Sequence, residues 1–276
     1  MLELLIDTTL DSLKLLPFLF GTYLVIELVN KKISDKTINS IKKTNRFGPL
    51  IGSFLGIIPG CGLAVAAANF YPKRIITLGS LISIFLVTTD AMIPILIANG
   101  ASIYIILKII TIQVIIGFIA GTIIDFTLRK KQIINLTGYE EKQCNKQTNI
   151  LKSATIHTLN IFYFIFVISL ALNILIASIG LDVLRGLLMQ ESIFGPFLAS
   201  IIGLIPNCTS SVLITELYLS NTITFGSTIA GLLSGASVGL LVLFRVNKDL
   251  KENLKIVTIL VTIGTISGII IDLFNI

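Results

Sequence analysis

The chain has 276 residues, of which 54% are hydrophobic and 13% are charged, with a mean hydropathy of +0.95 and a formal net charge of +6. Soluble domains carry about 25% charged residues, so this composition excludes a soluble core and predicts a polytopic membrane protein. The basic residues lie in short segments between apolar runs, a pattern typical of membrane loops rather than of nucleic-acid binding. The three Cys residues are too few for a disulfide framework.

An internal repeat organises the apolar runs. The segment from Phe47, FGPLIGSFLGIIPGCG, aligns with the segment from Phe194, FGPFLASIIGLIPNCT, at an offset of 147 residues. The alignment continues without a gap to Asp125, which falls on Asp272. Between Phe47 and Leu86, 16 of 40 positions are identical. We therefore predict two copies of one unit, joined by a polar linker; the expected boundaries are 1–128, 129–152 and 153–276.

Each copy contains three apolar runs long enough to cross about 30 Å of hydrocarbon. In chain order these predicted transmembrane helices are 10–30, 75–98 and 101–128, then 153–179, 222–244 and 255–275. A further segment in each copy, 47–71 or 194–217, is divided by Pro59 or Pro206 into pieces too short to cross alone. We predict that both segments are re-entrant helical hairpins, which gives an all-α fold of ten helices.

Charge placement favours the hairpins. If both hairpins return to their own side, one membrane face carries 18 of the 21 basic residues: six in 31–46, two at 73–74, six in 129–152 and four in 245–255. That bias is the one expected of a cytoplasmic face, so the linker is predicted to be cytoplasmic. Three crossings per copy would make the copies inverted repeats, a design of secondary transporters. Short interfacial helices are expected near 33–45 and 182–192.

The two predicted hairpin tips carry the chemistry that the repeat would bring together. Proline at a tip frees backbone groups, which must then be buried in protein or face a wet cavity. Free carbonyl groups, helix N-termini and the polar side chains at the two tips can together hold an ion or a small oxyanion. The alternative is that the small residues only allow close helix packing. We predict a midplane site; its hairpin residues are Pro59, Gly60, Cys61, Pro206, Asn207, Cys208, Thr209 and Ser210.

Asp90 lies inside a predicted span, within the sequence TTDAMIP. A carboxylate at that depth costs at least about 2.5 kcal/mol and commonly marks an ion or proton path. A structural pairing with Lys108 is the alternative. The repeat partner of Asp90 is Ser237, so only the first copy carries the acid. We assign Asp90 to the predicted ion site, and Thr89 and Ser237 to the pathway beside it.

Two further repeat partners, Asp11 and His157, lie near the beginnings of the first spans and are assigned to the same pathway. An interfacial position, where a polar group costs little, remains the alternative for both. Asp125 and Asp272 end their spans and are expected to be anchors. The chain has no G-x-x-x-x-G-K-[ST] sequence, so no ATP-driven step is expected. No cofactor is predicted, and no nucleophile-and-base triad is evident.

The sequence resembles the ten-helix heavy-metal exporters, a family that includes arsenic-efflux-like proteins and manganese transporters. The segments that carry the resemblance are FGPLIGSFLGIIPGCG, YPKRIITLGSLISIFLVTTDAMIPIL, IGLIPNCTSSVLITELYLS and GLLVLFRVNKDLKENLK. The resemblance implies that Pro59, Cys61, Asp90, Pro206, Asn207 and Cys208 belong to the family's site. Relatives often carry an acid after Asp90 and a His-rich central loop, whereas this chain has Ala91 and no His in 129–152.

The leading hypothesis is a secondary exporter of a metal or metalloid ion, coupled to protons through Asp90. Its metal ligands would be Cys61, Asp90, Asn207 and Cys208. Thiols suit arsenite, and oxygen ligands suit Mn²⁺, so the ion is left open. The alternatives are a lipid-pyrophosphate phosphatase, although the first tip lacks the charged phosphate clamp that such an enzyme needs, and a passive channel or organic-anion carrier.

The expected location is the plasma membrane of a bacterium or archaeon, with many crossings and the linker in the cytoplasm. The expected partners are an inorganic ion as substrate and membrane lipid, without nucleic acid or ATP. A homo-oligomer is left open, as are the coupling ion and the direction of transport.

Overall fold

The computed structural model describes residues 47–58, 61–88, 92–128, 194–206 and 208–274, together with separate helical positions inside 16–24 and 155–174. At 208 and 209 it describes the backbone alone. The linker 129–152, the segments 33–45 and 182–192, and most of the first span of each copy lie outside the described residues.

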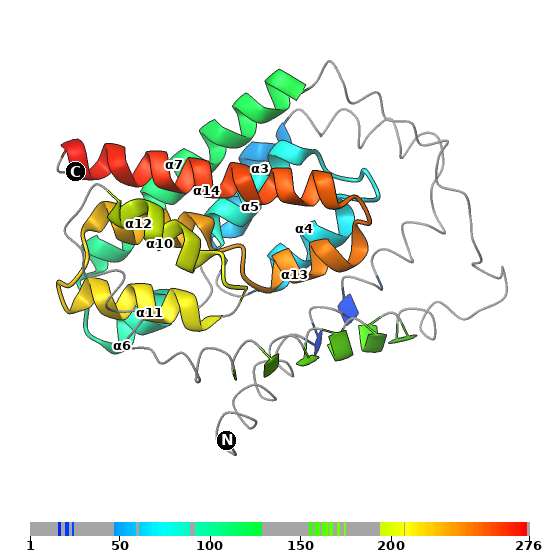
Figure 1. Ribbon diagram of the computed structural model, residues 1–276, viewed down its shortest axis with the longest axis horizontal. Coiled ribbons are helices and arrows are strands. Elements are labelled where there is room, and N and C mark those ends of the chain that lie inside the picture. Colours follow the sequence, from blue (N-terminus) through cyan, green and yellow to red (C-terminus); the bar gives the residue numbers. More distant parts are fainter. Residues whose placement is uncertain are drawn as a thin grey trace, which may run out of the picture.

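All regular elements in these described ranges are α-helices (Figure 1). In the first copy they are α3 (Gly48–Gly56), α4 (Gly62–Phe70), α5 (Leu78–Val87), α6 (Met92–Ala98) and α7 (Ile103–Leu128). In the second copy they are α10 (Gly195–Gly203), α11 (Cys208–Leu219), α12 (Phe225–Ser234), α13 (Ser237–Val246) and α14 (Leu250–Phe274).

Four helical stretches in this part of the chain are long and apolar enough to cross a membrane. They are Leu78–Ala98, Ile103–Thr127, Phe225–Val246 and Leu250–Phe274. Together with the all-helical architecture, they make this a multi-pass membrane protein. The two longest uninterrupted helices, α7 and α14, agree with the predicted spans 101–128 and 255–275, although α14 begins five residues earlier.

The predicted spans 75–98 and 222–244 are confirmed as helical stretches long and apolar enough to cross a membrane, but each of them is interrupted. The first span divides into α5 and α6, because Thr88 leaves the helical region with ψ 116°. The second divides into α12 and α13 at Gly235, whose ψ is 70°. Hydropathy does not detect such a break, because the residues on both sides of it stay apolar. Each copy therefore contains an interrupted helix in addition to the two helices around its proline.

Within each copy the same helices pack in the same way. In the first copy α5 lies between α3 and α7, and in the second α12 lies between α10 and α14. Small residues allow the close approach: a Cβ at Gly79 would lie 2.2 Å from the carbonyl oxygen of Gly121, and a Cβ at Gly226 would lie 2.2 Å from that of Gly268. Small residues at helix interfaces are the usual means of association in membranes. The offset of 147 residues is thus a repeat of contacts as well as of sequence.

Two aspartates cap matched helices. Asp125 accepts hydrogen bonds from the Thr77 hydroxyl at 2.6 Å and the Gly79 amide at 2.8 Å. Asp272 accepts the equivalent bonds from Thr224 at 2.7 Å and Gly226 at 2.8 Å. Both carboxylates satisfy amides that the first turn of α5 or α12 leaves without a helical partner, and the negative charge suits the helix dipole. The expected anchors are therefore helix caps.

The path of the first proline-containing segment follows from three glycines. A Cβ at Gly48 would meet Ser80, one at Gly52 would meet Ser80 and Ile84, and one at Gly56 would meet Val87. Helix α3 therefore runs parallel to α5, from the level at which α5 begins to the level at which it ends. Helix α4 then leads back, because the short connection 71–77 joins its end to the beginning of α5.

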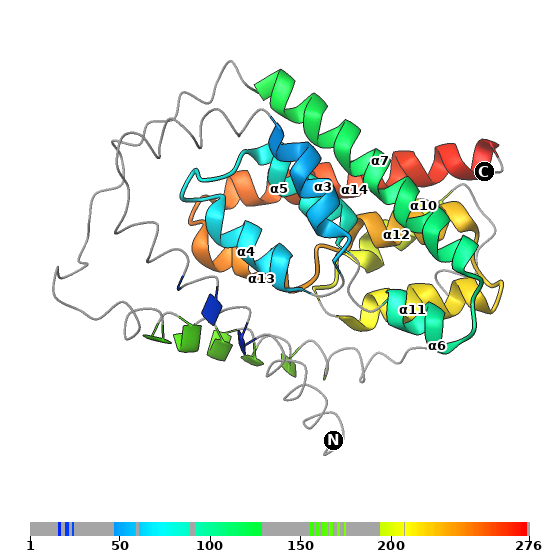
Figure 2. The same ribbon diagram turned by 180° about the vertical axis from the view of Figure 1, so that it is seen from behind.

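Two pairs of helices pack across the interface between the two copies. Helix α4 of the first copy packs against α13 of the second, and α11 of the second packs against α6 of the first. Both pairs are seen side by side from the front and from behind (Figures 1 and 2). The crossing of α4 and α13 is close, since a Cβ at Gly239 would lie 2.7 Å from the Cβ of Ala64.

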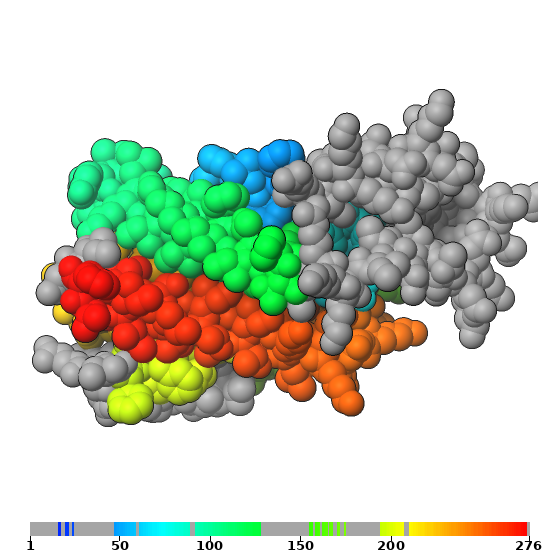
Figure 3. All heavy atoms as spheres, turned by 90° about the horizontal axis from the view of Figure 1, so that it is seen from above, coloured from blue at the N-terminus to red at the C-terminus, as the bar shows by residue number. Residues whose placement is uncertain are grey.

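The outer surface of the long helices is apolar. Helices α7 and α14 cover much of the face seen in Figure 3. Large apolar side chains on both helices are exposed, among them Phe118 and Ile123 of α7 and Ile266 and Leu273 of α14. An apolar face of this size is suited to contact with lipid.

Candidate functional site

Four helices stop or begin near one level of the molecule. Helices α3 and α5 end together, since a Cβ at Gly56 would lie 2.9 Å from the Cβ of Val87. Helices α10 and α12 also end together: a Cβ at Gly203 would lie 2.1 Å from the carbonyl oxygen of Gly231, and one at Gly235 would lie 3.6 Å from that of Gly203. Interrupted helices free backbone groups, so this level is where polar chemistry can be presented inside a membrane protein.

Cys61 and Ser237 meet at this level. The Cys61 Sγ and the Ser237 Oγ are 3.3 Å apart, although 176 residues separate them in the chain. Both side chains are buried, with 7% and 4% exposure. Cys61 stands directly before α4, and Ser237 is the first residue of α13. The contact therefore joins the first proline-containing turn to the break in the interrupted helix of the other copy.

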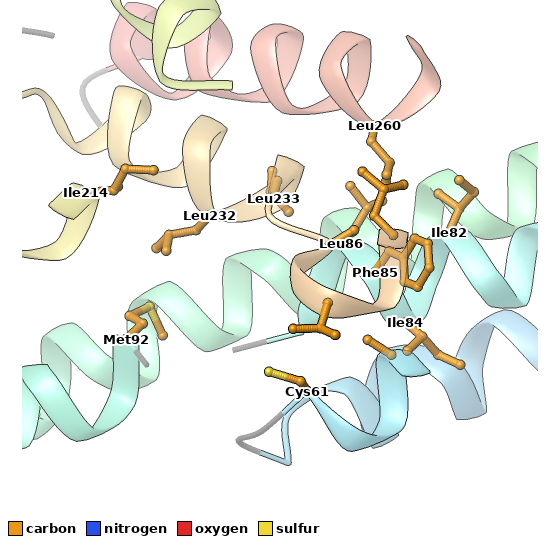
Figure 4. Packing of buried hydrophobic residues seen from close by; sticks show 14 of the residues in the cluster. Cys61, Ile82, Ile84, Phe85, Leu86, Met92, Ile214, Leu232, Leu233 and Leu260 are labelled. Atoms are coloured by element: carbon orange, nitrogen blue, oxygen red, sulfur yellow. The ribbon is translucent and has the colours of Figure 1, made fainter. Parts of the chain in front are cut away.

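The backbone at Ser237 is unusual. Its φ is +48°, in the left-handed region that residues with a side chain avoid at a cost of about 1–3 kcal/mol. Such strain persists where the surrounding structure enforces it, which is common at functional sites. Here it accompanies the hydroxyl that contacts Cys61. Figure 4 shows Cys61 at the beginning of α4, with the apolar side chains of Leu86 and Leu233 above it.

The second proline-containing turn is described in part. Pro206 is half-buried, and Ser210 is buried and donates a hydrogen bond to the Ile205 carbonyl at 3.1 Å. This bond satisfies one carbonyl that the end of α10 leaves outside the helical ladder. Helix α11 begins at Cys208, whose side chain, like that of Thr209, is not described.

The electrostatic character of the centre is set by helix N-termini. Helices α4 and α13 both begin at the Cys61–Ser237 contact. The unpaired amides of a first turn carry partial positive charge, which attracts anions and the oxygen atoms of polar ligands. A thiol, a hydroxyl and the first turns of two helices thus lie at one buried position. No group of three His, Cys, Asp or Glu side chains that could hold a metal ion occurs among the described residues.

Several predicted site residues lie outside the described part of the chain. These are Asp11, Pro59, Gly60, Thr89, Asp90, His157 and Asn207. Their assignment to the site remains a prediction. Of the residues that the structure does describe, it brings together Cys61 and Ser237, which the sequence analysis had placed in one site without predicting their contact.

Lys108, the proposed alternative partner of Asp90, has an aromatic contact. Its ammonium nitrogen lies 4.6 Å from the centroid of the Phe225 ring, at the beginning of α12. Cation–π contacts of this kind hold a Lys at a partly buried position.

Sequence reasoning missed two polar features. Gln113 in α7 is fully buried, and neither its Oε1 nor its Nε2 has a hydrogen-bond partner in the structure described. Its signal was an amide in the middle of a 26-residue apolar helix. Glu252 in α14 accepts hydrogen bonds from Tyr71 and Asn247. A charge in the first turn of a helix gives no sequence signal of a partner 181 residues away.

A comparison with protein-family models identifies the relatives of this chain. The model of a family described as "Putative, 10TM heavy-metal exporter" matches residues 2–193 and 182–276, which together cover almost the entire sequence. Searches of curated proteins and of solved structures gave no match.

Proposed function

The chain belongs to this family of heavy-metal exporters, and from that premise we propose that it is a secondary transporter that exports a metal or metalloid ion by proton antiport. The substrate would be arsenite or a divalent cation of the Mn²⁺ type. It would bind near the middle of the membrane, where the two proline-containing turns and the two helix breaks present their polar groups.

We propose that the two copies are inverted repeats with re-entrant hairpins at 47–71 and 194–217. Two observations support this arrangement. The matched long helices α7 and α14 run in opposite directions across the molecule (Figure 1). Helix α3 runs parallel to α5, and α4 then leads back towards the beginning of α5, which is the path of a hairpin that enters and leaves on one side. Broken helices at a repeat interface are the usual site of secondary transporters.

The Cys61–Ser237 contact is the observation that carries the proposal. It places a soft ligand and a hydroxyl at a buried junction between the copies, 3.3 Å apart. A thiolate or thiol suits a thiophilic species such as arsenite. At the same offset of 147 residues, the partners of Cys61 and Ser237 are Cys208 and Asp90. The second junction would therefore carry an acid where the first carries a hydroxyl.

Asp90 is proposed as the proton carrier. An acid in a membrane span can exchange a proton when the access to its site changes sides, and intramembrane acids are commonly used in this way. The position of Asp90 in this mechanism rests on the sequence. The expected surroundings are the plasma membrane of a bacterium or archaeon, with the basic linker 129–152 on the cytoplasmic face.

Growth and vesicle assays test this proposal. A host that lacks its own exporters should gain resistance to arsenite or to Mn²⁺ when it expresses the chain. Everted vesicles should accumulate the same ion when a pH gradient is applied. The double variant Cys61→Ser/Cys208→Ser should lose arsenite transport, and Asp90→Asn should lose the response to the gradient while exchange of the ion persists.

The same assays separate the alternatives. Uptake that ignores the pH gradient would indicate a passive channel or carrier. Phosphate release from lipid pyrophosphates by the purified protein would indicate a phosphatase. Full arsenite transport by the double cysteine variant would contradict soft-ligand binding at the two turns.

A further inference from the structure

Gln113 has a buried side-chain amide that makes no hydrogen bond within the described part of the chain. Its side chain has 0% exposure, and neither polar atom finds a hydrogen-bond partner among the residues described. An unpaired buried amide destabilises a protein, because water no longer satisfies its donors and its acceptor. A buried amide without a partner points to a hydrogen-bonding partner beyond the described residues, such as a bound ligand.

The register of α7 against α5 locates Gln113. A Cβ at Gly121 would lie 2.6 Å from the Gly79 carbonyl oxygen, and one turn away the Ser83 hydroxyl donates to the Gly117 carbonyl at 2.8 Å. The helices are therefore antiparallel, and one further turn along α7 brings Gln113 to the level of Val87, the last residue of α5. Gln113 lies on the same face of α7 as Gly117 and Gly121 because residues four apart share a face.

The direction of the side chain follows from helix geometry. In a helix the Cα–Cβ bond tilts towards the N-terminus. For α7 this direction leads beyond the end of α5, towards the interruption between α5 and α6. That interruption is at the level where α3 ends beside Val87, a few residues before Cys61. Gln113 thus lies at the level of the helix ends that border the proposed site, on a helix that contributes none of the other proposed site residues.

In the second copy an apolar side chain stands at the equivalent position. The repeat partner of Gln113 is Leu260 in α14, which is also fully buried. Leu260 is one turn from Gly264, whose Cβ would meet Ser234 and Ala230 of α12. The two positions have matched packing, and an apolar side chain fills the second one. The amide of the first copy therefore serves something specific to that copy.

We propose that Gln113 binds the transported species directly and contributes to its selection. This inference rests on the proposed transport function and adds a ligand from α7. The amide oxygen accepts a hydrogen bond and the NH₂ group donates two. This chemistry fits a substrate that carries O–H groups, either the hydroxyls of a metalloid oxyacid such as arsenite or the waters held by a divalent cation.

The decisive experiment measures transport and folding on the same reconstituted variants. Gln113→Leu copies the residue of the second repeat, and Gln113→Met keeps the length of the side chain without its polar atoms. In liposomes with an imposed pH gradient, both variants should raise the KM for the transported ion by at least about tenfold, the factor expected when one good hydrogen-bonding group to a ligand is lost. Thermal unfolding of both variants should occur at the wild-type temperature or above it.

Leu260→Met is the matched control and should leave KM unchanged. A raised KM for arsenite would assign the amide to the hydroxyls of the oxyacid, and a raised KM for Mn²⁺ would assign it to bound water. Should the wild type transport an ion whose KM neither Gln113 variant alters, the inference is overturned while the transport function stands. Lower unfolding temperatures in both variants would indicate a structural role and would also overturn it. Should the wild type transport neither ion, the proposed function fails, and this inference fails with it.

Discussion

The pair α4–α13 and the pair α11–α6 are built from matched helices, yet their outer ends differ. At the outer end of α4, Tyr71 donates a hydrogen bond to Glu252 in the first turn of α14. Arg74 lies 3.6 Å from the same carboxylate, and Asn247, which follows α13, donates to it at 3.0 Å. The fully buried Asn253 exchanges hydrogen bonds with Asn247 at 2.8 and 3.0 Å. We call these five residues the Glu252 network.

The other pair lacks the residues for such a network. At the offset of 147, Glu252 corresponds to Ile105, Asn247 to Gly100 and Arg74 to Asn221, and only Tyr71 has a like partner, Tyr218. The Tyr218 ring instead packs against Phe225, with ring centroids 5.8 Å apart. Arg74 and Asn221 do share a left-handed backbone, with φ of +57° and +53°, so the turns are alike although their side chains are not.

The repeat is retained inside each copy and has diverged where the two copies meet. Packing inside each copy, including the aspartate caps, is the same in both. At the end of α4–α13 the copies are joined by the hydrogen bonds to Glu252, whereas among the described residues at the end of α11–α6 Lys108 of the first copy lies over the Phe225 ring of the second. Hydrogen bonds to a charged acceptor need defined distances and angles, whereas a cation over an aromatic ring can occupy a wider range of positions. We therefore expect the α11–α6 end to separate more readily.

Of the changes that compare the two pairs, removal of the Glu252 carboxylate should have the largest effect on stability. Glu252→Ala leaves the Tyr71 hydroxyl without its acceptor and removes one of the two acceptors of the Asn247 amide, so unfolding in mixed micelles should become easier by about 3 kcal/mol. The control is Lys251→Ala, which removes an exposed charge from the same turn of α14 and should change stability by less than about 0.5 kcal/mol. Equal effects of the two variants would show that the Glu252 network does not distinguish the pairs.

The two tyrosines provide a matched pair of smaller size. Tyr71→Phe should cost about 1.5 kcal/mol, because it removes a hydrogen bond to a charged group. Tyr218→Phe keeps the ring contact with Phe225 and should cost close to zero. Thermal or detergent unfolding of both variants checks the difference, and a cost for Tyr218→Phe as large as that for Tyr71→Phe would contradict it.

Tyr71 also predicts a pH dependence. Burial, and next the hydrogen bond to Glu252, raise the pKa of Tyr71 above its ordinary value. The folded state therefore favours the protonated phenol, so its contribution is complete below the ordinary pKa of about 10 and decreases as the pH rises above it. Unfolding measured across this range should show the decrease in the wild type and lose it in Tyr71→Phe.

Loss of an aspartate cap should have the smallest effect on stability, and this effect should be equal in the two copies. Asp125→Asn and Asp272→Asn each weaken a cap that accepts one hydroxyl and one amide, at a cost of about 1 kcal/mol. Because the capping distances agree within 0.1 Å, the two costs should agree within about 0.5 kcal/mol. A clear inequality would show that the copies differ inside as well as at their junctions.

Much of the architecture could be predicted from the sequence because the repeat fixes it. The ungapped alignment from Phe47 to Asp125 correctly matched α3–α7 with α10–α14, and apolar length correctly predicted α7 and α14. The breaks after Val87 and Ser234 were missed, because Thr88 and Gly235 interrupt the helices without interrupting the hydropathy. Backbone conformation at a break depends on tertiary packing, which a window of residues does not contain.

The contact between Cys61 and Ser237 could not be predicted from the sequence. Cys61 and Ser237 were both singled out, but the alignment relates Cys61 to Cys208 and Ser237 to Asp90, so it suggests no direct pairing of the first two. Their contact arises because α4 of the first copy packs against α13 of the second copy. Gln113 was missed for a related reason, since only the structure shows that its amide is buried without a hydrogen-bond partner among the described residues.

The central claim is that the first proline-containing turn meets the break of the second copy at Cys61 and Ser237, on the path of the ion. The variant Ser237→Cys tests this directly, because a thiol there would lie within disulfide reach of Cys61. Oxidation should form a disulfide between Cys61 and the introduced thiol, identified by mass spectrometry of the two linked peptides. It should also stop ion transport until a reductant is added, whereas the wild type should be unaffected. Failure to form the disulfide, or full transport with it in place, would contradict the account.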